Sequence, residues 1–262
     1  MAATETSLTD QEKELYRCNL LLDRVGEDGQ LRLKASRVLV IGAGGLGSPA
    51  LLYLGAGGIG EIGIVDGDRV DLSNLQRQVV HGREDIGKKK TLSARETLHR
   101  LRPDLRVTLH TCRLTDSNAG EILAPYDFVI EATDNFESKF LVNDFCMRLN
   151  KPFSHAGVVG WYGQTMTVLP GKGPCFRCIF QQPPGETPGI TTREMGVLGT
   201  VAGILGLIQA TETLKYLLGA GNLLVGRLLT LDALSMTFRE VKLPLDKRCR
   251  VCASCQMTQD NS

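Results

Sequence analysis

The chain has 262 residues, of which 42% are hydrophobic and 23% are charged. Such an average composition excludes a disordered, collagenous or coiled-coil chain, and the length suits one large α/β domain. The formal net charge of +1 gives no overall attraction to nucleic acid or to an anionic membrane, so neither is expected as a partner. Two counts stand out, 29 glycines and 8 cysteines.

The first residues carry acidic groups before any apolar run, which is wrong for a signal or transit peptide: Glu5, Asp10, Glu12 and Glu14. We therefore expect a cytoplasmic protein, in which clustered cysteines are metal ligands or catalytic groups rather than disulfides. The longest uncharged stretch, between Glu194 and Glu212, has 17 residues and barely reaches the minimum for a membrane span. Its glycines repeat on one helix face, which favours a buried or subunit-interface helix: Gly196, Gly199, Gly203 and Gly206.

The first half of the chain alternates predicted strands and helices. After an amphipathic helix at about 10–23, a β-branched run at 37–41 predicts a buried strand. A glycine turn, a helix at 48–54 that ends at Gly55, Gly57 and Gly58, and a strand at 61–65 complete a βαβ unit. Further segments alternate in the same way, namely a helix at 88–101 that stops before Pro103 and strands at 106–111 and 127–130.

The second half has a different pattern. Residues 163–169, 228–231 and 236–243 are typical of antiparallel strands, which we expect to extend the same sheet around the glycine-striped helix. The Pro- and Gly-rich segment 182–189 predicts an exposed loop. The fold class predicted is α/β, a Rossmann-like, doubly wound, mostly parallel sheet extended by antiparallel strands. We expect one domain over 1–262, with a helical segment (1–35), a Rossmann-like half (36–150) and an antiparallel, zinc-binding half (151–255).

A glycine-rich loop, Gly42-Ala-Gly44-Gly45-Leu-Gly47, follows the first predicted strand and opens a helix. In this context the glycines allow a tight turn and close approach to a phosphate, and the helix N-terminus supplies N–H groups to negative charge. Asp66 ends the next strand, where a carboxylate can accept hydrogen bonds from ribose hydroxyls. These features predict an adenosine nucleotide, and they fit NAD and ATP equally well.

The charged residues that follow distinguish the two nucleotides. Hydride transfer gives no reason to gather cations such as Arg77 and Lys90 near phosphates, whereas phosphoryl or nucleotidyl transfer does. Lys88 and Lys89 have the alternative of ordinary surface charge on a helix, which we prefer for these two. Asp134 and Asn135 follow the fourth strand, where the carboxylate could hold Mg²⁺ on a triphosphate, although a helix N-cap is the competing role for either residue.

Four segments together make the chain recognisable: VLVIGAGGLGSP, IVDGDRVDLSNLQRQ, GKKK followed by SA, and EATDN. From about Tyr16 to Cys252 the sequence resembles the ThiF/MoeB/HesA family of adenylyltransferases, which are relatives of the ubiquitin-activating enzymes. The resemblance implies that ATP activates the C-terminal glycine of a ubiquitin-like sulfur-carrier protein ending in Gly-Gly. In that reaction the carboxylate attacks the α-phosphate, an acyl-adenylate forms and pyrophosphate leaves.

The resemblance also implies roles for individual residues. Gly44 lines the nucleotide loop, Asp66 holds the ribose and Asp134, with Asn135 beside it, is the Mg²⁺ and triphosphate partner. The group around the phosphates consists of Asp68, Asn74, Arg77 and Lys90. The catalytic set is Arg77, Lys90 and Asp134. A homodimer is implied, as are a sulfur donor protein and a place in molybdopterin or thiamin-type biosynthesis.

Two CxxC pairs, Cys175 with Cys178 and Cys249 with Cys252, lie about seventy residues apart. Four thiolates at this spacing predict a closed tetrahedral site for a structural Zn²⁺, and the family resemblance points to the same four residues. A Cys252/Cys255 pair stays open as the alternative second pair. A thioredoxin-like redox motif is disfavoured because neither CxxC opens a helix after a suitable strand.

The sequence departs from the family pattern in two places. Many relatives have a nucleophilic cysteine before the glycine-striped helix, where this chain has Thr192. A hydroxyl is a poor substitute for a thiolate, so we expect the protein to stop at the adenylate. Relatives also show an N-terminal arginine that reaches the partner subunit's nucleotide, and here Arg17 stands one position away.

The remaining cysteines and the histidines have no ligand or triad spacing. We interpret Cys18, Cys112 and Cys146 as small buried hydrophobic residues. The histidines are read as ordinary core or surface residues: His81, His99, His110 and His155. Two other function classes remain as alternatives, an NAD-dependent oxidoreductase and a non-catalytic adaptor that binds a carrier protein or nucleotide without turnover.

Overall fold

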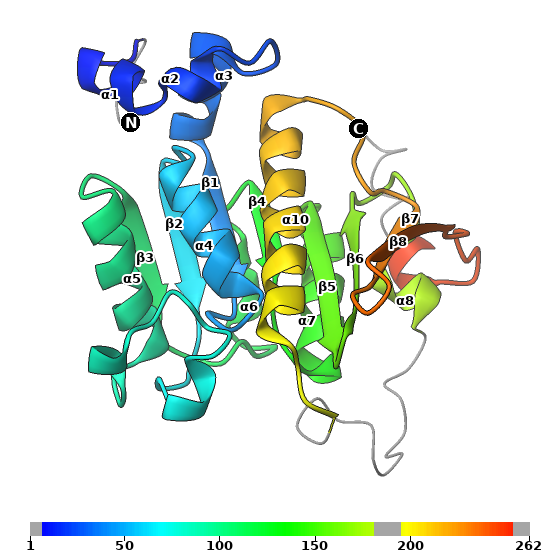
Figure 1. The fold of residues 1–262 in the computed structure, drawn as a ribbon. Helices are drawn as coiled ribbons and strands as arrows, with labels where there is room; N and C mark the ends of the chain where they lie inside the picture. Colours follow the sequence, from blue (N-terminus) through cyan, green and yellow to red (C-terminus); the bar gives the residue numbers. More distant parts are fainter. Residues whose placement is uncertain (1–6, 181–194, 254–262) are drawn as a thin grey trace.

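A computed structural model describes residues 7–180 and 195–253 and contains one eight-stranded sheet of order β3-β2-β1-β4-β5-β6-β7-β8 (Figure 1). The first five strands along this order run parallel. They are β3 (Arg106–His110), β2 (Glu61–Val65), β1 (Arg37–Ile41), β4 (Phe128–Glu131) and β5 (Phe153–Val159). Except for β3, which is partly exposed at the sheet edge, they are short and largely buried, as expected for parallel strands covered on both faces.

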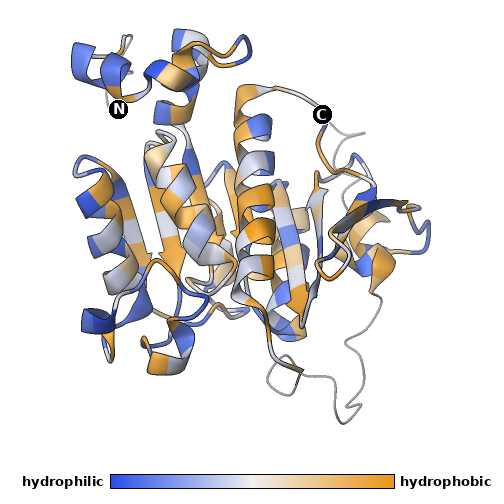
Figure 2. Cartoon of the chain, in the orientation of Figure 1, coloured by the Kyte–Doolittle hydropathy of each residue, from blue (hydrophilic) through white to orange (hydrophobic). Residues whose placement is uncertain are grey.

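Helices cover both faces of the parallel strands. Three lie on the front face in Figure 1, namely α4 (Gly47–Ala56), α5 (Lys90–Leu101) and α10 (Gly199–Leu218). On the opposite face lie α6 (Ala119–Leu123) and α7 (Phe136–Arg148). Alternate residues of β1 enter two separate cores, since Val38 packs with the front helices and Leu39 with the rear ones. Figure 2 shows these apolar residues concentrated on the strands and on the helix faces that meet them.

The second half of the chain extends the sheet with antiparallel strands. These are β6 (Tyr162–Val168), β7 (Arg227–Asp232) and β8 (Thr237–Lys242). A short helix, α8 (Phe176–Ile179), follows the loop after β6. The predicted Rossmann-like sheet with an antiparallel extension is therefore confirmed. The loop predicted at 182–189 lies outside the described residues.

The N-terminal region differs from the single helix predicted at 10–23. It forms three helices, α1 (Asp10–Leu15), α2 (Arg17–Leu20) and α3 (Gly26–Ala35). Thr9 begins α1 with a capping box to Glu12, and the buried ring of Tyr16 interrupts the helix. In Figure 1 these helices lie at the amino ends of the parallel strands, away from the loops at their carboxyl ends.

Two further expectations need correction. Strand β5 was not predicted, because Ser154, His155 and Gly157 interrupt its apolar residues. The glycine-striped helix begins only at Gly199, so Gly196, with a φ of +70°, precedes it. Gly206 does lie against α4, where a Cβ atom would fall 2.1 Å from the Leu46 carbonyl oxygen. In the described parts of the chain, no helix combines the length and the apolar character needed to cross a membrane.

Candidate nucleotide site and cysteine cluster

The glycine loop joins β1 to α4 at the carboxyl edge of the sheet, where the loops after β2 and β4 also gather (Figure 1). Gly42 has a φ of +100°, and a Cβ atom there would lie 2.7 Å from the Ala132 carbonyl oxygen. Only glycine therefore lets the ends of β1 and β4 approach so closely. At Gly44 a Cβ atom would meet nothing nearer than Gln78 Nε2, at 3.9 Å, which leaves the loop open on one side.

The glycine loop just before α4 offers backbone donors at this open side. Among the described residues, the N–H groups of Gly44 and Gly45 have no acceptor. Free N–H groups in a glycine loop that leads directly into the N-terminus of a ten-residue helix form a site for negative charge. The loop thus fits the phosphates of a nucleotide, as the sequence predicts for Gly44.

Asp66 follows β2 and is tied to the same loop. Its Oδ2 accepts the N–H of Ala43 at 2.9 Å, and its Oδ1 accepts the N–H of Asp68 at 2.8 Å. A carboxylate has about four acceptor positions, so both oxygens keep capacity for ribose hydroxyls. The carboxylate is half-buried beside the glycine loop, where its predicted role requires it.

The segment 74–81 wraps around the open side of the loop. Asn74 ends a 3₁₀-helix (Leu72–Asn74), and its side chain accepts the N–H of Asp71, so this residue also has a capping role. The Arg77 side chain lies beside Gly45, with Cγ 3.4 Å from the position of a Cβ atom there. Gln78 is buried next to Gly44, and its Oε1 has no partner among the described residues. An orphaned buried amide beside free N–H groups is consistent with a site that completes its hydrogen bonds on binding a polar ligand.

Lys90 is the first residue of α5 and is buried, with its Nζ 3.4 Å from Asp68 Oδ2. The structure thus brings the predicted residues Asp68 and Lys90 together. The two preceding lysines have structural partners, because Lys88 pairs with Asp85 and Lys89 donates to the Gly67 carbonyl. Both lysines are half-buried and precede α5, so the interpretation as surface charge on a helix is corrected: their ammonium groups hold the turn before the helix.

Asp134 and Asn135 lie in the turn between β4 and α7. Asn135 is the N-cap of α7, because its side-chain oxygen accepts the N–H of Ser138 at 2.8 Å. Asp134 is exposed beside it, and no contact of its carboxylate occurs among the described residues. Of the two roles that the sequence left open, the cap belongs to Asn135 and Asp134 keeps its carboxylate free for a ligand.

A buried charged cluster, which sequence reasoning missed, holds this turn. Lys139 Nζ donates at 2.8 Å to Glu131 Oε2 and to the Thr133 and Ala156 carbonyls. His155 Nδ1 lies 2.8 Å from the same Oε2, and Thr133 donates to Oε1 from both its N–H and its hydroxyl. Burial opposes ionisation of Glu131, but Lys139 and His155 outweigh it and lower its pKa to about 2. Glu131 is thus a buried carboxylate that fixes the backbone just before Asp134.

His81 was read as an ordinary histidine, and the structure places it directly under the glycine loop. It is buried, with Nε2 3.1 Å from the Ala43 carbonyl oxygen and Nδ1 2.7 Å from Ser93 Oγ. Burial lowers its pKa, so the ring is neutral near pH 7. The sequence does not predict this contact, because Ala43 and His81 meet only when α5 packs beside the loop.

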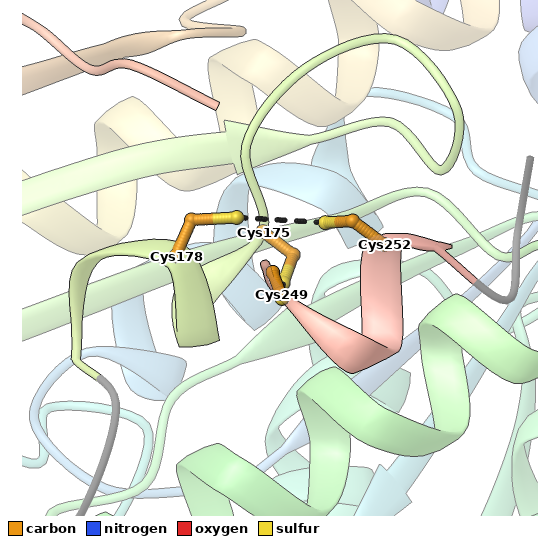
Figure 3. Close-up of side chains that lie close together, drawn as sticks. All are labelled: Cys175, Cys178, Cys249 and Cys252. Atoms are coloured by element: carbon orange, nitrogen blue, oxygen red, sulfur yellow. Dashed lines mark hydrogen bonds between the residues drawn. The ribbon is translucent and has the colours of Figure 1, made fainter. Parts of the chain in front are cut away.

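The four cysteines of the two CxxC pairs converge beside the antiparallel part of the sheet (Figure 3). Their Sγ atoms all lie within 4.8 Å of one another, with Cys175 and Cys249 at 3.7 Å and Cys178 and Cys252 at 3.5 Å. A tetrahedral zinc site with bonds of about 2.3 Å places its sulfurs about 3.8 Å apart. The cluster therefore fits Zn²⁺ held by these four residues, with no position left for a substrate.

Without a cation, burial keeps these thiols in their protonated form. Burial raises the pKa of Cys178 to about 11, and the Cys252 sulfur together with burial raises the pKa of Cys175 further. Buried thiols are thiolates near pH 7 only where a positive charge such as Zn²⁺ stabilises them. Cys255, the alternative ligand, lies outside the described residues, and so does Thr192.

The other cysteines only partly follow the expectation. Cys146 is buried and Cys112 is half-buried, but Cys18 is exposed, which corrects its assignment as a buried hydrophobic residue. Arg17 is exposed on α2, 3.8 Å from Glu14, at the end of the sheet opposite the glycine loop. Within one chain it therefore lies away from the candidate site.

Comparisons with known proteins agree with this geometry. The model of the ThiF family matches residues 16–251. A sulfur carrier protein adenylyltransferase from Thermus thermophilus is 44% identical over 249 residues, which span 93% of this chain and 92% of that protein. A SAMP-activating enzyme E1 from Haloferax volcanii is 44% identical over 248 residues, 94% of this chain and 91% of that one.

The fold is also found among solved structures. The crystal structure of E. coli MccB with MccA-N7isoASN has a TM-score of 0.79 at 22% identity, over 92% of this chain and 74% of that one. MccB with ATP has a TM-score of 0.77 at 20% identity, over 94% and 82%. The match of the family model over most of the sequence, together with these relatives, establishes that the chain belongs to the ThiF family.

Proposed function

We propose that this protein is an ATP-dependent adenylyltransferase that activates the C-terminal glycine of a ubiquitin-like sulfur-carrier protein. One observation carries the proposal: the glycine loop before α4 has free N–H groups at Gly44 and Gly45, Arg77 and Gln78 flank it, and Asp66 is bonded to it. Relatives that are 44% identical carry the names of sulfur-carrier adenylyltransferase and SAMP-activating enzyme.

The chemistry follows from the charges at the carboxyl edge of the sheet. A carboxylate oxygen of the carrier's last glycine attacks the α-phosphorus of ATP, and the bond to the bridging oxygen of the β-phosphate breaks. Pyrophosphate leaves with the electron pair, and the glycine becomes a mixed anhydride with AMP. Negative charge grows on the phosphate oxygens during this step, so prepositioned donors and cations lower the barrier.

Each predicted residue then has a role. The Gly44 N–H and the Asn74 side chain bind phosphate, while Arg77 and Lys90 neutralise charge on the leaving pyrophosphate. Asp66 accepts hydrogen bonds from the ribose, and Asp68 orients Lys90 through their 3.4 Å contact. Asp134 holds Mg²⁺, which supplies further neutralisation of the triphosphate. Asn135, beside Asp134, caps the start of α7 with its side chain.

The partners follow from the same proposal. The carrier ends in Gly-Gly, because only glycine lets an extended C-terminus approach the α-phosphate closely. The family resemblance supports a homodimer. Arg17 lies far from the candidate site of its own chain and one position away from the arginine that relatives direct at the partner's nucleotide, so no role across the dimer is assigned to it. A separate sulfur donor serves molybdopterin or thiamin-type biosynthesis. Thr192 stands where relatives have the cysteine nucleophile, so the enzyme stops at the adenylate. A cytoplasmic location stays a prediction.

The proposal is tested by following the label from ATP. With a candidate carrier, α-³²P-ATP should label the carrier and γ-³²P-ATP should not, whereas a carrier lacking its last glycine should take up neither. The absence of α-label on every carrier, despite ATP binding, would favour the adaptor alternative. A carrier adduct that survives denaturation but is released by a reducing agent would contradict the proposed end at the adenylate.

A further inference from the structure

We propose that His81 is a positioning residue that orients the Gly44 N–H toward the nucleotide phosphates. The inference deepens the proposed function and rests on it, because it concerns the same nucleotide loop. It assigns a role to a buried side chain that touches no substrate and that the reaction described above does not use.

Ala43, the residue before Gly44, is held at both of its backbone polar groups. Its N–H donates to Asp66 Oδ2 at 2.9 Å, and its carbonyl oxygen lies 3.1 Å from His81 Nε2. A carbonyl oxygen can only accept, so Nε2 carries the proton in this contact. Ala43 is itself fully buried, and these two side chains clamp it from the β2 loop and from the segment before α5.

The clamp determines which way the next N–H points. All peptide bonds in the described chain are trans, and in a trans peptide the C=O of one residue and the N–H of the next point in opposite directions. Because His81 holds the Ala43 carbonyl, the Gly44 N–H is directed away from His81. This N–H has no acceptor among the described residues, as a donor reserved for a ligand requires.

The imidazole ring is itself well anchored. Its Nδ1 accepts from Ser93 Oγ at 2.7 Å, and Ser93 lies on α5 one turn after Lys90. Thr97, one further turn along α5, donates to the Val80 carbonyl beside His81 at 2.8 Å. The charged groups that act on the ring are Lys90, Asp66 and Asp85. The ring thus links the glycine loop to the helix that carries Lys90, and the two phosphate-binding elements keep a fixed spacing.

Preorganisation of this kind matters only for a ligand with phosphates. If the loop peptide can rotate, the Gly44 N–H is no longer aimed at the phosphate and one charge-assisted hydrogen bond is lost. Asp66 and the adenosine portion of the site are not affected by this rotation, so adenosine should bind as before. The comparison of ATP with adenosine therefore separates positioning of the N–H from a general effect on folding.

The test measures dissociation constants of ATP and of adenosine by calorimetry, without carrier, for the native protein and three variants. His81→Leu should weaken ATP binding about tenfold, the value of one charge-assisted hydrogen bond, and leave adenosine binding unchanged. His81→Gln, which can still donate to the Ala43 carbonyl, should recover most of the affinity. His99→Leu is the matched control, since His99 Nε2 lies 3.1 Å from the Leu105 carbonyl at the far end of α5.

Equal losses for ATP and adenosine in His81→Leu, or no loss for either, would overturn the role of His81. A native protein that binds no ATP at all would instead overturn the proposed function, and the inference with it. If His81→Leu does not fold, Ser93→Ala replaces it, because it removes only the hydroxyl that holds Nδ1. Weaker binding of ATP alone by Ser93→Ala supports the proposal, and unchanged ATP binding contradicts it.

Discussion

At the scale of single residues, the turn before Asp134 depends on a buried ion pair between Glu131 and Lys139. Removing one partner of such a pair leaves an uncompensated buried charge. Lys139→Met should therefore lower the free energy of unfolding by about 3–5 kcal/mol, measured by urea titration. The double variant Glu131→Gln/Lys139→Met removes both charges and should recover part of the loss.

Lys151→Met is the control for this prediction. Lys151 also donates to a backbone carbonyl, that of Tyr126 at 2.7 Å, but no carboxylate among the described residues pairs with it. Its substitution should cost about 1 kcal/mol, as for one ordinary hydrogen bond. Equal losses for Lys139→Met and Lys151→Met would show that the buried charge pair contributes nothing special.

The same carboxylate makes stability depend on pH. Burial acts against its ionised form, but Lys139 and His155 lower the pKa of Glu131 from 4.5 to about 2 in the folded chain. The folded state therefore gains stability above pH 4.5 that is lost as the pH falls toward 2. Urea midpoints measured between these pH values should fall less steeply in Glu131→Gln than in the native protein, and parallel curves would contradict the assignment.

What the sequence could predict at this scale depends on whether contacts are local. The glycine loop, Asp66 and the CxxC pairs could be predicted, because each is a short motif whose residue types and spacing indicate its chemistry. The roles of His81 and Lys139 could not be predicted from the sequence. Their partners, Ala43 and Glu131, approach them only after α5 and α7 pack on the sheet. A single histidine or lysine in a sequence does not indicate which distant residue it will contact.

At the scale of elements, the long helix α10 packs against α4 through a single close glycine. A Cβ atom at Gly206 would fall 2.1 Å from the Leu46 carbonyl oxygen, whereas at Gly203 it would meet nothing within 4 Å. Gly206→Ala should therefore destabilise the protein by about 1–3 kcal/mol through overpacking. Gly203→Ala should leave stability unchanged or raise it by up to about 1 kcal/mol, because alanine favours the helix.

Thermal unfolding of the two glycine variants checks this difference directly. A destabilised Gly203→Ala together with a tolerated Gly206→Ala would contradict the packing of α10 on α4. The helix also shows where pattern reasoning fails for elements. Regular glycine spacing indicated a stripe from Gly196, but Gly196 precedes the helix and Gly203 has open space, so spacing alone does not reveal which glycines touch a neighbour.

Strands such as β1 and β2 were predicted because β-branched and other apolar residues dominate them. The missed strand β5 contains the buried residues Ser154 and His155. Glu131 binds the imidazole of His155 and Gln209 donates to the Ser154 backbone carbonyl, whereas the Ser154 hydroxyl has no partner among the described residues. Polar partners in other elements thus allow a polar strand in the core. Such hydrogen bonds form only in the assembled sheet, so the local sequence pattern of a strand does not predict them.

At the scale of the whole molecule, the cysteine cluster joins the loop after β6 to the C-terminal residues. Metal analysis of the purified protein should give one zinc ion per chain, lost in Cys175→Ser and retained in Cys18→Ser. Removal of zinc by a chelator should lower the unfolding temperature of the native protein. Retention of zinc by Cys249→Ser would point to Cys255 as the ligand and would contradict the observed cluster.

The central claim is that the carboxyl edge of the sheet activates a carboxylate with ATP. Exchange of labelled pyrophosphate into ATP, measured with a carrier ending in Gly-Gly, tests it most directly because the reaction reverses only through the acyl-adenylate. The account predicts carrier-dependent exchange that falls at least a hundredfold in Asp134→Ala and in Arg77→Ala, while ATP remains bound to Arg77→Ala. Exchange that is absent with every carrier, or equal in native protein and Asp134→Ala, would contradict it.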